Sequence, residues 1–204
     1  MEKVIMLKLS VFNKFLFLPR IILFVFFATS QGYSQNISIT LGAPITNGGL
    51  RFNSSNISFD LSATKEYHKN IFLGIELSYI STDLAPTMTD LVQYKRKMFE
   101  GFVKCAYHKK SESKFSYSPV IKIGYAYVDF SSDRIASNIL SSVGLSLSEE
   151  IIGFYQLSQN IEIISGIGLS TVFLSHPITL PSHFPTTEKI VNQFKIKLGI
   201  QYNF

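Results

Sequence analysis

The feature that most constrains the fold of this chain is the alternation of apolar and polar side chains over residues 193–204. One face of this segment carries large apolar residues, namely Phe194, Ile196, Leu198, Ile200, Tyr202 and Phe204. The other face carries polar or small residues, namely Gln193, Lys195, Lys197, Gly199, Gln201 and Asn203. A period of two residues is typical of a β-strand whose two faces meet different surroundings. The segment is therefore predicted to be a strand.

The same period recurs along the chain and defines eight predicted strands. They span residues 36–45, 57–68, 71–82, 97–109, 115–130, 148–159, 161–174 and 190–204. Short turns at Lys69-Asn70, at 110–114 and at Asn160 alternate with connections of about 11 to 17 residues. Short turns on one side and long loops on the other predict an all-β fold, a closed antiparallel up-and-down barrel of eight strands.

Alternation alone does not show which face of such a barrel points inward. A soluble lipocalin-like barrel alternates too, with its apolar face inside. Here the apolar face is bulky and aromatic, whereas the polar face is rich in glycine, serine and threonine. Because eight strands enclose an interior only just wide enough for side chains, the small polar face fits inside and the apolar face is predicted to face lipid.

The spacing of the aromatic residues supports this orientation. Four predicted strands carry two apolar-face aromatics eight residues apart: Phe59 and Tyr67, Phe99 and Tyr107, Tyr117 and Tyr125, Phe194 and Tyr202. Eight residues cover about 26 Å along a strand, or roughly 20 Å of height at a tilt of about 40°. That height approaches the apolar band of about 25 Å, edged by two aromatic girdles, that a membrane barrel presents to lipid.

Residues 1–34 have the layout of a cleavable secretory signal peptide. Four basic residues precede the apolar run 21–28, and Gly32 and Ser34 suit a cut after Ser34. An N-terminal membrane anchor is the alternative, although the apolar run is about half of the ~20 residues that a spanning helix needs. Without this segment, 15 basic and 13 acidic residues remain, a net charge of +2. This balance does not favour nucleic-acid binding, and the barrel domain is predicted to span residues 35–204.

The predicted lumen contains four acidic and four basic side chains. They are Asp60, Glu76, Glu100, Glu162, Lys104, Lys122, Lys195 and Lys197. If the strands at 71–82, 97–109 and 115–130 pair through their long loop and short turn, Glu76 should lie near Lys104, and Glu100 near Lys122. Because a buried charge is tolerated when it is paired and hydrogen-bonded, we interpret the set as a salt-bridged plug. A narrow ion path is the alternative.

No pattern in the sequence indicates catalysis, a metal site or a cofactor. His176 and His183 share the last long connection with Ser182 and Glu188, but neighbours in a proline-containing loop do not define a nucleophile and its base. The histidine spacing does not match a metal site, and the single cysteine, Cys105, excludes an internal disulfide.

Two predicted loops have unusual compositions. Residues 131–147 interleave apolar residues with serines, and could extend the neighbouring strands or form an apolar tip. Residues 84–96 lead into the basic run Tyr94-Lys95-Arg96-Lys97, which could meet lipid phosphates at the outer rim.

The signal-like segment, the eight alternating segments and the last strand together resemble the small outer-membrane β-barrel family that includes the OmpA transmembrane domain and OmpX. The resemblance implies a monomer in the bacterial outer membrane, exported through the periplasm. It also implies contact with outer-membrane lipid and lipopolysaccharide, and with periplasmic chaperones and the barrel-assembly machinery during biogenesis. The assembly signal would be carried by Leu198, Ile200, Tyr202 and Phe204.

Such a resemblance does not imply one activity, because function depends on sites and not on the fold. We favour a non-enzymatic structural or surface-interaction protein that acts through its long loops. The alternatives are a narrow porin-like channel for small solutes or ions, a lipid-modifying enzyme at the rim, and a soluble lipocalin-like lipid binder.

Overall fold

The computed structural model describes residues 35–45, 56–84, 94–109, 113–132, 140–180 and 186–204. All regular structure in these ranges is β-strand. The described residues contain no helix that is long and apolar enough to cross a membrane. The predicted signal peptide, residues 1–34, lies outside the described part of the chain.

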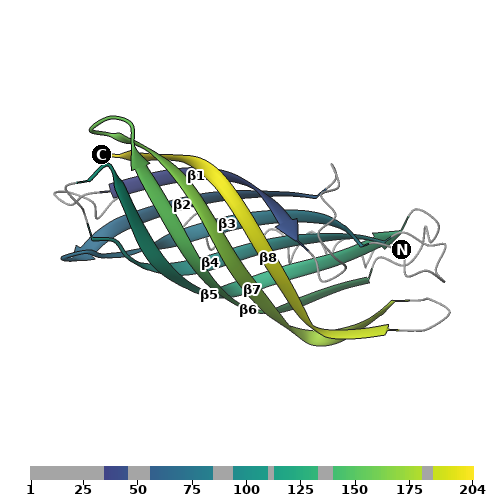
Figure 1. Ribbon diagram of the computed structural model, residues 1–204. Coiled ribbons are helices and arrows are strands. Elements are labelled where there is room, and N and C mark those ends of the chain that lie inside the picture. Colours follow the sequence, from purple (N-terminus) through teal and green to yellow (C-terminus); the bar gives the residue numbers. More distant parts are fainter. Residues whose placement is uncertain (1–34, 46–55, 85–93, 110–112, 133–139, 181–185) are drawn as a thin grey trace, which may run out of the picture. The chain divides into compact units, whose positions relative to one another are not determined.

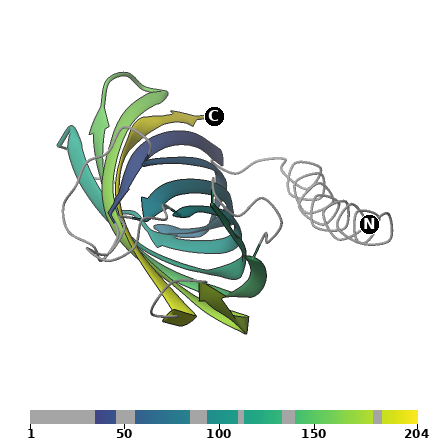
Figure 2. The same ribbon diagram turned by 90° about the vertical axis from the view of Figure 1, so that its right-hand side faces the viewer.

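Eight strands form one closed ring in which every strand pairs with its neighbours in sequence, and β1 pairs with β8 (Figures 1 and 2). The strands are β1 (Gln35–Ile45), β2 (Ile57–His68), β3 (Ile71–Leu84), β4 (Tyr94–Tyr107), β5 (Phe115–Ser132), β6 (Leu140–Gln156), β7 (Ile161–Leu180) and β8 (Thr186–Asn203). All eight pairings are antiparallel. The predicted up-and-down barrel is therefore confirmed.

The two ends of the barrel differ in their connections. The C-terminus lies at the same end as the β6–β7 turn, and we call this end the turn end and the opposite one the loop end (Figure 1). In the predicted β2–β3 turn, Asn70 has a φ of 67°, a left-handed conformation that asparagine tolerates better than most residues. The pairing of β1 with β8, which closes the ring, continues to the turn end, where the Phe204 amide donates to the Gln35 carbonyl at 2.9 Å.

The strands on one side of the barrel are longer than predicted. β6 begins at Leu140 and not at residue 148, β7 continues to Leu180, and β8 begins at Thr186. The serines of residues 140–147 favour a loop, because serine is common in turns. In the barrel, however, Ser142 and Ser146 face the lumen, where a small hydroxyl fits. Residues 140–147 thus extend β6, which confirms for them the predicted extension of the neighbouring strands over the alternative of an apolar tip.

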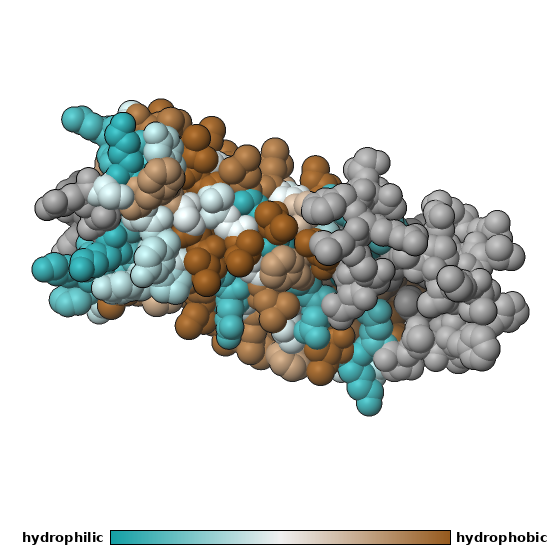
Figure 3. Space-filling view, viewed as in Figure 1, coloured by the Kyte–Doolittle hydropathy of each residue, from teal (hydrophilic) through white to brown (hydrophobic). Residues whose placement is uncertain are grey.

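The apolar face of every strand points outward. The four predicted aromatic pairs are all exposed on the outer wall, whereas serines, threonines and charged side chains are buried inside. Apolar side chains cover the middle of the wall, and hydrophilic ones gather at its turn end (Figure 3). A lipocalin-like barrel would have the opposite arrangement, so the soluble alternative is wrong and the outer surface is built for lipid.

Candidate functional site

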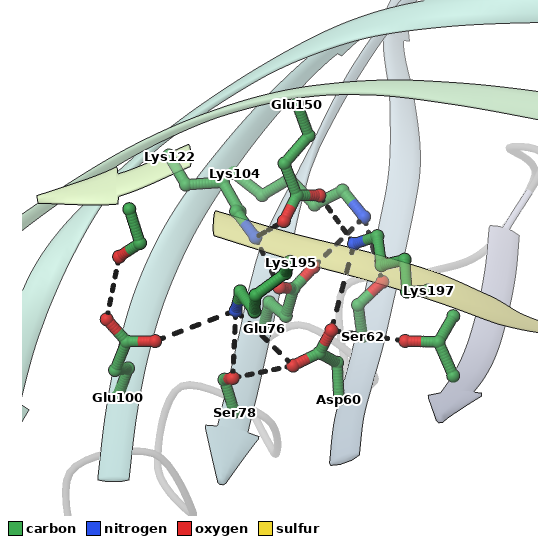
Figure 4. Close-up of polar contacts among 12 residues, drawn as sticks. Asp60, Ser62, Glu76, Ser78, Glu100, Lys104, Lys122, Glu150, Lys195 and Lys197 are labelled. Atoms are coloured by element: carbon green, nitrogen blue, oxygen red, sulfur yellow. Dashed lines mark hydrogen bonds and ion pairs between the residues drawn. The ribbon is translucent and has the colours of Figure 1, made fainter. Parts of the chain in front are cut away.

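The most unusual feature of the barrel is a cluster of eight buried charged side chains across its lumen. These residues, which we call the charge network, are Asp60, Glu76, Glu100, Glu150, Lys104, Lys122, Lys195 and Lys197. They come from β2, β3, β4, β5, β6 and β8, and the inward face of each strand directs them toward one another (Figure 4). Four acids and four bases make the charge network neutral.

Lys122 is at the centre of one half of the network. Its Nζ lies 2.5 Å from Glu76 Oε1 and is also paired with Glu150 Oε1. Glu150 Oε2 lies 2.5 Å from Lys197 Nζ, and Glu76 Oε2 lies 3.3 Å from Lys104 Nζ. Lys122 is also close to the Phe102 ring, whose centroid lies 5.0 Å from Nζ. Each carboxylate in this half therefore bridges two ammonium groups.

The other half surrounds Lys195. Its Nζ lies 3.7 Å from both Asp60 Oδ1 and Glu100 Oε2, and it donates to Ser78 Oγ at 3.2 Å. Small hydroxyl groups complete the solvation of the acids. Asp60 accepts from Ser78 at 2.5 Å and from Thr40 at 3.1 Å, and Glu100 accepts from Ser146 at 2.8 Å and from Ser170 at 3.0 Å. Hydroxyl donors thus replace water at both Asp60 oxygens and at Glu100 Oε1, whereas the buried Glu100 Oε2 has no hydrogen bond among the described residues and faces Lys195.

Seven of the eight predicted lumen charges belong to the network. Glu162 does not: it is only partly buried at the turn end, where it accepts from Gln201 Nε2 at 2.8 Å. The predicted Glu76–Lys104 pair is confirmed, but the predicted Glu100–Lys122 pair is wrong, because Lys122 reaches Glu76 and Glu150 instead.

Glu150 was missed for an identifiable reason. It follows Glu149, so one of these two acids must face inward. In the predicted strand 148–159 both faces carry apolar residues, Ile151 and Tyr155 with Glu149 and Ile152 and Phe154 with Glu150, so the pattern did not show which acid faces inward. The alternation of the full strand from Leu140 settles the choice, since Glu150 shares its face with Ser146 and Ser148.

Apolar side chains fill the lumen on both sides of the charge network. Toward the loop end lies an upper apolar layer of Ile80, Met98, Ala126, Val128, Phe130, Val172, Ile178 and Val191. Toward the turn end lies a lower apolar layer of Phe72, Ala106, Val120, Ile152, Phe154 and Ile164. The order is visible on β3, where Phe72, Glu76 and Ile80 follow one another on the inward face.

Two cavities lie near the lower apolar layer in the described part of the barrel. A cavity beside the lower apolar layer and Lys104 has a volume of about 20 Å³, which is room for roughly one water molecule. A larger cavity of about 250 Å³ lies at the turn end and is lined by polar residues, including His108, Ser116 and Glu162. The His108 ring packs on Phe72 and Phe154, and its Nε2 lies 3.0 Å from Ser116 Oγ. His108 lines both cavities, and the smaller one passes the lower apolar layer and reaches Lys104.

The candidate residues at the loop end are only partly within the described ranges. His176 lies exposed on β7, where its backbone bonds to the Ser142 hydroxyl, while Ser182 and His183 lie outside the described residues. In the predicted basic run, Arg96 faces inward and donates to Gln193 Oε1 at 3.0 Å, whereas Lys95 and Lys97 face outward. Over the described ranges, no group of three or more His, Cys, Asp or Glu is arranged to hold a metal ion.

The four residues of the predicted assembly signal lie together on the outer wall. Leu198, Ile200, Tyr202 and Phe204 are all exposed on one face of the chain's last strand. The Tyr202 and Phe204 rings meet edge to face at the turn end, with centroids 4.8 Å apart. Both rings thus lie at one end of the outer wall, as an aromatic girdle requires, and their position on the periplasmic side and their part in assembly stay predictions.

The fold is similar to that of several solved membrane barrels. Neisserial surface protein A superposes with a TM-score of 0.57 at 10% identity, covering 85% of this chain and 98% of that one. The attachment invasion locus protein Ail of Yersinia pestis, in complex with the heparin analogue sucrose octasulfate, gives 0.54 at 14% identity, covering 85% and 100%. A major outer membrane protein of Thermus thermophilus gives 0.57 at 13% identity, covering 83% and 99%.

At these identities the likeness is one of fold. No family model matches the sequence, and no curated protein matches it significantly. The closed ring, the polar lumen and the apolar outer wall agree with the fold of these three proteins. The chain is thus an eight-stranded transmembrane β-barrel with the fold of the small bacterial outer-membrane proteins.

Proposed function

We propose that this protein is a non-conducting barrel of the bacterial outer membrane that acts as a structural or surface-interaction protein through its extracellular end. The observation that carries this proposal is the filled lumen. A neutral charge network lies between two apolar layers, and the cavity beside Lys104 has room for roughly one water molecule.

A hydrated ion could pass only by losing its water. In the charge network every carboxylate is already paired with lysine, so a passing cation would compete with an existing ammonium group. In the apolar layers an ion would exchange much of its hydration for contact with apolar side chains, and the desolvation of an unpaired charge costs far more than thermal energy. These contacts favour a plug over a channel.

The part of the barrel available for interactions is its loop end. Strands β5 to β8 contain 17 to 20 residues each, whereas β1 to β4 contain 11 to 14. About 9 to 11 residues suffice to cross the bilayer, so one side of the barrel extends well beyond it. Short turns of such barrels face the periplasm, which places this extension outside the cell.

Planar-bilayer recordings test the plug. The folded wild-type protein should insert without producing steady single-channel conductance, because both apolar layers block the lumen. Insertion is verified independently by the altered migration of the unheated protein on SDS gels. A steady conductance that is abolished by Glu76→Gln would show that ions pass through the charge network and would establish the channel alternative.

Epitope labelling tests the orientation of the strand extension. A tag inserted between residues 181 and 185 should bind antibody on intact cells, because it joins the extended strands β7 and β8. A matched tag inserted between residues 110 and 112, in the β4–β5 connection, should bind only after the outer membrane is permeabilised. The reverse pattern would place the extension in the periplasm and remove the basis for a surface role.

A further inference from the structure

The smaller of the two cavities, of about 20 Å³, has the lower apolar layer on one side and polar residues on the other. The layer is built from β3, β4, β5, β6 and β7. The opposite side comes from β8, β1 and β2, which present Gln201, Asn36, Ser38 and Thr64 to the cavity. We call these four residues, together with Ser62 on β2, the polar lane, and all five are buried on the inward faces of their strands. The lower apolar layer thus lines β3 to β7, whereas the polar lane lines β8, β1 and β2.

At the turn end the polar lane meets the larger cavity. Gln201 lines the smaller cavity, and its Nε2 donates to Glu162 Oε2 at 2.8 Å and to Asn203 Oδ1 at 3.0 Å. Glu162 and Asn203 both line the larger cavity of about 250 Å³, and His108 lines both cavities. A water molecule takes up about 30 Å³ in the liquid, so the larger cavity has room for several. Polar groups therefore connect a space that holds water with the smaller cavity.

At its other end the polar lane reaches the charge network. Ser38 Oγ lies 2.9 Å from Ser62 Oγ, which accepts a hydrogen bond from Lys104 Nζ at 3.1 Å (Figure 4). The Lys104 side chain lines the smaller cavity and is 7% exposed, whereas the Lys122 and Glu150 side chains have no exposed surface. The smaller cavity thus meets the network at Lys104.

Two polar groups at the smaller cavity have incomplete hydrogen bonding. Asn36 Oδ1 is buried and has no hydrogen-bond partner among the described residues. The Lys104 ammonium has three N–H donors, and two of them are used by Ser62 and Glu76. Buried water commonly completes the hydrogen bonds of such groups, because an unpaired buried polar group is costly. The smaller cavity has room for roughly one water molecule, which would donate to Asn36 Oδ1 or accept from Lys104.

We propose that the smaller cavity is a water-binding site filled from the turn end along the polar lane, and that the upper apolar layer is the seal of the barrel. Toward the loop end, Ile80, Met98 and Val172 of that layer have no exposed surface. Short turns of such barrels face the periplasm, so this water comes from the periplasm and bypasses the lower apolar layer. The inference rests on the proposed plug and assigns its closure to one of the two layers.

The reaction of Ag⁺ with introduced thiols tests the water route. Thiolate binds metal ions, and Ag⁺ is close to a water molecule in size, so it enters spaces that larger thiol reagents cannot. The full-length protein carries Cys105→Ser, to remove its native thiol, and Ser38→Cys, which places a thiol in the polar lane. Two other inward serines provide matched controls: Ser148→Cys beside the network, at 1% exposed, and Ser58→Cys toward the loop end, at 0%.

The folded protein in detergent micelles is treated with Ag⁺ in chloride-free buffer, which gives the ion access to both ends of the barrel. The remaining thiol is then measured by maleimide labelling after unfolding in SDS. The Ser38→Cys thiol should be lost at least about tenfold faster than either control thiol, because water reaches position 38. In the Ser38→Cys protein, Asn36→Leu should slow the loss, since a larger apolar side chain fills the smaller cavity, whereas the small polar side chain of Asn36→Ser should not. The heat-dependent gel shift verifies folding of each variant.

Three results would overturn the proposal. Equal rates at positions 38 and 148 would show that the polar lane gives no special access to water. Equal rates at positions 38 and 58 would show that water also enters from the loop end, and an undiminished rate in Asn36→Leu would show that it does not pass through the smaller cavity. Failure of the plug itself would appear separately, as steady conductance of the wild-type protein in planar bilayers.

Discussion

Lys122→Met should lower the free energy of unfolding of the barrel by about 3 to 5 kcal/mol, because it removes one partner of a buried ionic cluster and leaves the others. Glu76 would keep only Lys104, and Glu150 would keep only Lys197, and the cavity beside Lys104 has room for roughly one water molecule. The network would also carry one uncompensated negative charge. Urea-induced unfolding of the protein in phospholipid vesicles measures this loss.

The matched double variant separates charge balance from packing. Lys122→Met combined with Glu150→Gln again gives equal numbers of acids and bases, three of each, and should recover at least half of the lost stability. Buried ion pairs often contribute little compared with a neutral replacement of both partners, whereas an unpaired charge is costly. A Lys122→Met protein within about 1 kcal/mol of wild type would contradict this account of the charge network.

Gly124→Ala should destabilise the barrel by about 1 to 3 kcal/mol, because the β4–β5 wall has no room for a side chain at this inward position. A Cβ added to Gly124 would lie 1.9 Å from the Gly101 carbonyl oxygen and 2.9 Å from the Phe102 Cα. Both contacts are with backbone, so relief requires the two strands to move apart. The same urea titration measures the effect.

Gly101 provides the control in the same pair of strands. An added Cβ there faces outward, and its nearest neighbour is the Leu77 Cδ2 atom at 3.8 Å, an ordinary contact. Gly101→Ala should therefore unfold within about 0.5 kcal/mol of wild type, as surface substitutions usually do. Equal effects at positions 101 and 124 would show that loss of glycine flexibility, and not steric conflict, governs both variants.

The alternation of side chains was sufficient to predict the architecture. A period of two identifies strands directly, and the size and polarity of each face identify which one points to lipid. Strand ends at the loop end could not be predicted in the same way. In β6 the residues from Leu140 do alternate, but serines that are common in loops occupy part of both faces. In β7 the register with β8 shifts between Phe173 and Ile178, which breaks the period of two before the strand ends at Leu180.

The lumen was only partly predictable. Charged residues on a polar face are conspicuous, which is why seven members of the charge network were identified from sequence. The two apolar layers were not predicted, because inward apolar residues such as Ile80 and Met98 resemble irregularities in the pattern until neighbouring strands are placed in register. Pairing between network members was harder still, since long lysine side chains reach past their direct cross-strand partners: Lys122 is opposite Ser148 but contacts Glu150.

The central claim, that the apolar wall of this barrel faces lipid, is tested most directly at Cys105. This single native cysteine is exposed on the outer wall of β4, two residues inside Tyr107, between Leu73 and Ile121. A charged, water-soluble maleimide reacts with thiolate in water, so its access to Cys105 reports whether water covers this wall.

In lipid vesicles the folded protein should label at less than about one tenth of the rate of a Cys105→Ser, Ser158→Cys control, whose thiol lies in the exposed β6–β7 turn. Heating in SDS should then expose Cys105 to full labelling. Labelling of native, folded Cys105 as fast as the turn control would show that water covers the apolar wall and would contradict a transmembrane barrel.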